Sequence, residues 1–138
     1  MKKILGLDVG DARIGIAIAE KNLVAPYSIV SNRNLQEAIA EIAKICRREE
    51  ISKIVIGVPK NQENKSMFQI DKTYLFAREL SKIIQIPIIY VDETLTTKEA
   101  ERQLNGGKDK KSLEYKEEID KIAAKLILEQ YLEKNNKI

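Results

Sequence analysis

The stretch ILGLDVGDARIGIAIAE, residues 4–20, contains a cluster of charged residues and glycines. Apolar residues in the alternating pattern of a strand flank this cluster on both sides. The flanks predict strands at residues 3–7 and 14–19. The cluster contains a carboxylate, Asp8, two glycines, Gly10 and Gly15, and the guanidinium of Arg13. Because burial penalises charge, an acid at the end of an apolar strand needs a compensating partner.

Composition narrows the class of protein. With 138 residues, 43% hydrophobic and 33% charged, we expect one globular domain over residues 1–138. Apolar runs such as residues 87–91 are too short to span a membrane, and Asp8 interrupts the first run too early for a signal peptide. The chain has no histidine and one cysteine, Cys46, which excludes histidine-based catalysis and an internal disulfide. We expect Cys46 to be buried filler on a helix.

The chain predicts an α/β fold with the order βββαβαβαα. The expected strands share an apolar pattern of strand length and cover residues 3–7, 14–19, 25–30, 53–58 and 86–91. The expected helices share helical spacing of apolar residues and cover residues 35–48, 70–84, 96–104 and 117–132. Short connections predict an antiparallel three-strand meander, to which crossovers add two parallel strands. We therefore expect a mixed five-stranded sheet flanked by helices.

Acidic residues follow the ends of two of these strands. Asp8 ends the first strand, and Asp92 and Glu93 follow the last one. Ligands of open α/β sheets bind at the carboxyl ends of the strands, so these acids are expected at one edge. Helical geometry turns Asp120, on the last helix, partly toward the sheet. The strand ending in GVPK brings Lys60 to the same edge, where we expect it to contact the substrate.

Crowded carboxylates repel one another unless a cation compensates them. The hard, oxygen-liganded choice is Mg²⁺ or Mn²⁺, and two such ions are typical of phosphodiester cleavage. We therefore predict a metal site at Asp8, Asp92, Glu93 and Asp120. Taken singly, each acid is also typical of a turn or a helix N-terminus.

The remaining motif residues suggest substrate contacts. Gly10 is expected to take a positive φ or to let backbone amides approach an anion, and Gly15 to let a neighbouring element pack closely. Arg13 either clamps a phosphate or pairs with Asp11. No Rossmann or Walker glycine pattern is present.

A basic loop precedes the last helix. Lys108, Lys110 and Lys111 follow Gly106 and Gly107 in this stretch. It is either a solvated connector or an arm that contacts the phosphate backbone.

Four motifs, DVGDARIG, IGVP, VDETLTT and IDKIAAKLILEQYL, resemble the YqgF-type family in order and spacing from residue 4 to about residue 132. That family has a ribonuclease-H-like fold and is described as pre-16S rRNA nucleases or Holliday junction resolvases. The resemblance implies a cytoplasmic, metal-dependent nuclease with catalytic residues Asp8, Glu93 and Asp120, and Arg13 matches the family arginine. Thr94 stands where the family usually has arginine, a contact that Lys98 or Arg102 could replace.

Several functions stay open at this stage. The resemblance to ribonuclease-H-like enzymes implies cleavage of a nucleic-acid phosphodiester that leaves 5′-phosphate and 3′-hydroxyl ends. The family description favours the 5′ end of pre-16S rRNA over a Holliday junction, whereas the chemistry of the residues suits both. The partner is then structured RNA or branched DNA, bound by a monomer or a homodimer. The alternatives are a non-catalytic nucleic-acid-binding module and an ATPase-like or sugar-kinase-like phosphate binder.

Overall fold

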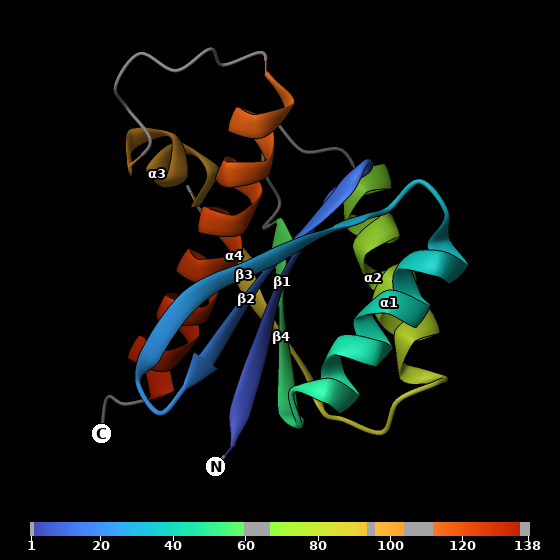
Figure 1. The fold of residues 1–138 in the computed structure, drawn as a ribbon. Coiled ribbons are helices and arrows are strands. Elements are labelled where there is room, and N and C mark those ends of the chain that lie inside the picture. The colour runs from blue at the N-terminus through green and yellow to red at the C-terminus, as the bar shows by residue number, and fades with distance from the viewer. Residues whose placement is uncertain (1, 60–66, 94–95, 104–111, 136–138) are drawn as a thin grey trace.

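The computed structural model describes residues 2–59, 67–93, 96–103 and 112–135 (Figure 1). Its elements follow the predicted order. The strands are β1 (Lys3–Val9), β2 (Arg13–Glu20), β3 (Leu23–Ser31), β4 (Ile51–Pro59) and β5 (Ile88–Glu93). The helices are α1 (Leu35–Arg48), α2 (Met67–Ser81), α3 (Thr96–Gln103) and α4 (Leu113–Asn135).

The strands form one mixed sheet with the order β3-β2-β1-β4-β5. β1 pairs antiparallel with β2, and β2 with β3, whereas β4 is parallel to both β1 and β5. The predicted meander with two added parallel strands is confirmed. The carboxyl ends of β1, β4 and β5 consequently lie at one end of the sheet.

Helices cover both faces of the sheet. Figure 1 shows α1 and α2 on one face and α4 on the other, with α3 beside α4. The α1 and α2 side has a core that includes Leu5, Leu7 and Phe76. The α4 side has a second core that includes Val55 and Leu128. Side chains alternate between the two faces of a strand. Gly6 and Asp8 therefore face α4, whereas Leu7 between them faces α1 and α2.

Two helices differ from their expected bounds. α4 begins at Leu113, four residues before the expected start, because Ser112 caps it and its Oγ accepts from the Tyr115 N–H at 3.1 Å. α2 begins and ends three residues earlier than the expected 70–84. Cys46 is buried in α1 as expected, and burial raises the pKa of its thiol to about 11.

Helices α1, α2 and α4 pack on the sheet, and α3 packs on α4. In the part of the chain that the structure describes, no helix combines the length and the apolar character that crossing a membrane requires.

Candidate active site at the carboxyl edge of the sheet

The turn between β1 and β2 is closed by its own backbone. The Gly10 N–H donates to the Arg13 carbonyl at 2.9 Å. A Cβ on Gly10 would lie 2.9 Å from that same oxygen, so the close approach requires glycine. The expectation of a positive φ at Gly10 is wrong, and its amide is not available to an anion. Gly10 serves the shape of the turn.

Asn32, just after β3, holds this turn in place. Its side-chain amide donates to the Gly10 carbonyl at 2.8 Å, and its backbone N–H donates to the Ala12 carbonyl at 2.8 Å. The sequence analysis did not identify Asn32 as a site residue; Asn34, two residues further on, caps α1 by accepting from the Glu37 N–H at 3.0 Å. The signal for Asn32 was present, since asparagine next to a strand end commonly bonds backbone groups.

Three of the predicted acids lie on the sheet face that α4 covers. Asp8 is the penultimate residue of β1, Glu93 is the last residue of β5, and both are half-buried. Asp8 pairs across the ladder with Gly15 of β2. The backbone of Asp120 in α4 lies directly over Gly15, where any Cβ would collide with it. The expectation that Gly15 admits a close neighbour is confirmed.

The side chain of Asp120 is engaged by Arg13. The Arg13 Nε–H donates to Asp120 Oδ2 at 2.7 Å, with about a quarter of each side chain exposed. Burial raises the pKa of the Asp120 carboxyl, the Arg13 hydrogen bond opposes that rise, and the negative charges of Glu117 and Glu93 add to it. The alternative that Arg13 pairs with Asp11 is wrong, because Asp11 instead pairs with Lys72 at 3.0 Å.

Of the other predicted metal ligands, the structure describes Asp92, which does not join these three acids. Asp92 is exposed and alternates to the sheet face opposite Glu93. Arg102, offered as a substitute for the family arginine, pairs with Glu99 on α3 at 2.8 Å. Thr94 and the predicted substrate-contacting lysines lie outside the described residues; those lysines are Lys60, Lys108, Lys110 and Lys111.

The donor set suits a hard cation. Asp8, Glu93 and Asp120 offer carboxylate oxygens from three different elements on one face. Within residues 2–59, 67–93, 96–103 and 112–135, no three acidic or cysteine side chains are close enough to enclose one ion. Mg²⁺ is usually held by one or two carboxylates, together with water and substrate phosphates, rather than by a complete protein cage. The residues therefore fit Mg²⁺ or Mn²⁺.

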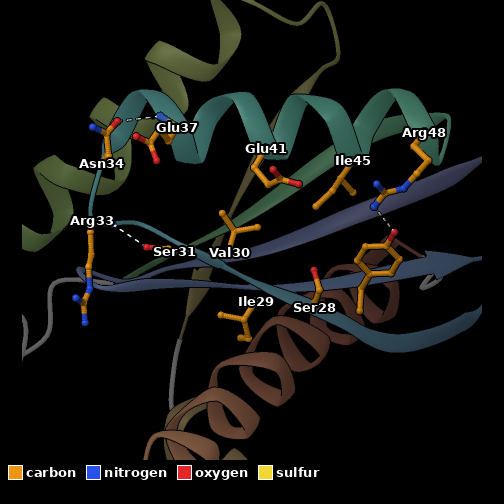
Figure 2. A pocket seen from close by; sticks show the side chains of 11 residues that line it. Ser28, Ile29, Val30, Ser31, Arg33, Asn34, Glu37, Glu41, Ile45 and Arg48 are labelled. Atoms are coloured by element: carbon orange, nitrogen blue, oxygen red, sulfur yellow. Dashed lines mark hydrogen bonds between the residues drawn. The ribbon is translucent and has the colours of Figure 1, made fainter.

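A separate groove of about 620 Å³ lies between β3 and α1. Figure 2 shows Glu41, Ile45 and Arg48 of α1 above Val30 and Ser28 of β3. Its described lining carries both signs of charge and includes none of the predicted site residues. This groove is on the opposite face from α4 and is not part of the carboxylate site.

Comparisons with known proteins identify the family of this chain. A family model described as "RuvX: Holliday junction resolvase" matches residues 2–134. A relative from Caldanaerobacter subterraneus subsp. tengcongensis, named "Putative pre-16S rRNA nuclease", is 36% identical over 95% of this chain and 96% of its own length. A relative of the same name from Carboxydothermus hydrogenoformans is 38% identical over 98% of this chain and 99% of its own.

Solved structures of low sequence identity share the fold. Thermus thermophilus RuvC in complex with a Holliday junction substrate superposes with a TM-score of 0.59 at 12% identity, covering 97% of this chain and 96% of RuvC. Fowlpox virus resolvase in complex with Holliday junction DNA gives 0.56 at 17% identity, covering 98% and 99%. The family resemblance seen in the sequence is confirmed: the chain belongs to the RuvX, or YqgF-type, family of nucleases with a ribonuclease-H-like fold.

Proposed function

We propose that this nuclease hydrolyses a phosphodiester at the carboxyl edge of its sheet with Mg²⁺ or Mn²⁺, and that its substrate is the 5′ region of the 16S rRNA precursor. One observation carries the proposal: Asp8 of β1, Glu93 of β5 and Asp120 of α4 face the same side of the sheet in a chain without histidine. Carboxylates are then the groups available to position a cation beside a phosphate.

Each residue has a distinct role in the proposed reaction. Asp8 of β1 lies between Gly15 of β2, over which Asp120 packs, and Glu93 of β5, so it is placed to contribute to either side of the site. One or two of the carboxylates of Asp8, Glu93 and Asp120 would hold the cation together with water and the substrate phosphate, and the contact with Gly15 keeps the Asp120 backbone close to the sheet. The divalent cation, when bound, supplies activation of a water molecule and stabilisation of the leaving oxygen.

Arg13 balances charge at this site. Its guanidinium bonds Asp120 and opposes the rise that burial causes in the pKa of that carboxyl. The same guanidinium carries further N–H donors, which are suited to a phosphate oxygen. We therefore assign Arg13 a shared role, orienting Asp120 and contacting the backbone of the substrate.

The choice of RNA rests on the relatives. Chains that are 36% and 38% identical over nearly their full length are named for the 16S rRNA precursor, whereas the RuvC structure is 12% identical. Holliday junction cleavage is the second candidate, favoured by the description of the family model. The metal chemistry would be the same for both substrates.

A cleavage assay with two substrates tests the proposal. The wild-type chain would be incubated with Mg²⁺, Mn²⁺ or EDTA and either a labelled precursor RNA spanning the 16S 5′ end or a synthetic four-way junction. We expect metal-dependent cutting of the RNA that leaves 5′-phosphate ends. Asp8→Asn should abolish cutting, while Glu41→Gln, an exposed change on α1, should leave it unchanged.

Three outcomes would contradict parts of the proposal. An active Asp8→Asn variant would overturn the carboxylate assignment. Cutting of the junction alone would favour the second candidate. Cutting of neither substrate would indicate a non-catalytic binding module. Because removing a crowded negative charge relieves repulsion, Asp8→Asn should melt at or above the wild-type temperature, which separates loss of chemistry from loss of fold.

A further inference from the structure

A small cavity opens on the other side of the first turn from the carboxylates. It has a volume of about 220 Å³ and lies between the end of β1, the segment that follows β3, and α2. We propose that this cavity receives one unpaired nucleobase of the substrate strand, next to the phosphodiester that is cut. The inference rests on the proposed nuclease function and names a subsite for its substrate.

The volume suits one nucleobase. It corresponds to roughly seven water molecules at their share of liquid volume. Pockets for drug-sized ligands are larger, about 300–1,000 Å³. A single nucleobase is of the size that this cavity admits, whereas a folded peptide segment or a dinucleotide is not.

The lining combines an apolar floor with a polar rim. Val9, Leu35, Leu75 and Phe76 form the apolar part; Phe76 is 1% exposed and Leu75 39%, so the floor reaches from the core to the surface. Splayed bases are bound in this way, with the ring against apolar or aromatic groups and its edge toward hydrogen-bonding groups. Asn32 lies on the rim, and its side-chain carbonyl remains an acceptor after its amide bonds Gly10.

The rim also carries positive charge. Lys72 bonds Asp11 at 3.0 Å, but the two side chains are 42% and 63% exposed, so this pair is weak and can be exchanged for a phosphate. Arg33 is exposed, and no carboxylate in the described part of the chain pairs with its guanidinium. Figure 2 shows the Arg33 side chain pointing away from α1, at the β3 end that leads into Asn34. The phosphate of the nucleotide that carries the bound base would meet these cations.

The position links the cavity to the proposed chemistry. Asp8 faces α4, and the next residue, Val9, faces the cavity. The Cα atoms of neighbouring residues are about 3.8 Å apart, and these two side chains leave opposite faces of the same strand where the sheet ends. A nucleic-acid strand that passes over this edge can therefore meet Asp8 on one face and the cavity on the other. The turn between them is held by Asn32, so the arrangement exists before substrate binds.

A titration without catalysis tests the proposal. Amide ¹H–¹⁵N spectra of the wild-type chain in EDTA would be recorded with CMP, AMP and ribose 5-phosphate. We expect CMP to shift the amides of Asn32, Lys72 and Leu75, and to bind about tenfold more tightly than ribose 5-phosphate, because the base adds stacking interactions. AMP should also bind more tightly than ribose 5-phosphate, because a purine is within the volume of the cavity.

Matched variants make the result specific. Leu75→Trp should fill the cavity and reduce CMP binding at least tenfold. Tyr74→Trp should not, because Tyr74, the preceding residue on α2, is 44% exposed and does not line the cavity. Arg33→Ala should weaken CMP and ribose 5-phosphate alike, and Arg47→Ala on α1 should weaken neither. Circular dichroism would check that each variant is folded.

The outcomes separate the two proposals. Equal binding of CMP and ribose 5-phosphate would overturn the base subsite and leave a phosphate site. The absence of shifts at these amides up to about 10 mM CMP, a concentration that reveals even millimolar affinity, would overturn the cavity assignment altogether. Unchanged binding in Leu75→Trp would do the same. Because the titration contains no metal and measures no cleavage, failure of the nuclease assay would not alter its interpretation.

Discussion

Arg13 and Asp120 are 107 residues apart in the sequence, yet the Arg13 Nε–H donates to Asp120 Oδ2 across 2.7 Å and joins β2 to α4. Both side chains are largely shielded from water, at 25% and 22% exposed. A charged hydrogen bond in such a place contributes more than one on the open surface. This bond sets the orientation of a proposed catalytic acid.

A double-mutant cycle on this pair measures its strength. Arg13→Ala, Asp120→Ala and the double variant should give a coupling free energy of about 1 kcal/mol or more in urea unfolding. The same cycle on Lys72 and Asp11, which are more exposed, should give less than about 0.5 kcal/mol. Equal coupling in the two cycles would show that the Arg13 contact is only a surface ion pair.

Gly15 should be the least replaceable glycine of the sheet face under α4. A Cβ at Gly15 meets the backbone of Asp120, which cannot rotate away, whereas at Gly57 it meets the end of the Ile127 side chain, which can. We expect Gly15→Ala to lower the free energy of unfolding by about 1–3 kcal/mol, and Gly57→Ala to lower it less. Chemical denaturation would compare the two, and a larger decrease for Gly57→Ala would contradict the packing described.

Glu49, just after α1, should make stability depend on acid pH. Its carboxylate accepts from the Tyr27 hydroxyl at 2.8 Å and from Lys3 Nζ at 3.1 Å, and these bonds lower its pKa. A lowered pKa in the folded state gives stability that is present above the unfolded value, about 4.3, and is lost as pH falls through the folded value. The melting temperature of Glu49→Gln should therefore fall less than that of wild type below about pH 4. The same charge change at Glu41→Gln should keep the wild-type slope.

The basic loop is tested by salt dependence. If Lys108, Lys110 and Lys111 contact phosphates, changing all three to Ala should weaken binding to any nucleic-acid sequence alike. The slope of log affinity against log salt should flatten by up to about one unit for each phosphate that the variant no longer neutralises. Cleavage at saturating substrate should change much less. Unchanged affinity and slope in a filter-binding series would make the loop a connector.

The fold was predictable because the strands carry clear period-two and apolar patterns, and short connections leave little choice of pairing. The positions of Asp8 and Glu93 followed from the strand ends. What could not be predicted depends on contacts between distant segments. The partner of Arg13 is on α4. The hydrogen bonds of Asn32 to the first turn depend on β3 returning beside that turn. Asp92 was grouped with Glu93 by adjacency, although neighbouring strand residues face opposite sides.

The order of the strands has a consequence for synthesis on the ribosome. β1, β2 and β3 pair with their neighbours in sequence, so the meander can form as soon as residues 3–31 have emerged, and β4 and β5 add to one edge afterwards. Asp120 arrives only with α4, the last element. A nascent chain with its sheet complete would therefore still lack one of the three proposed catalytic acids. The proposed active site would be complete only after α4 has been translated and has packed on the sheet.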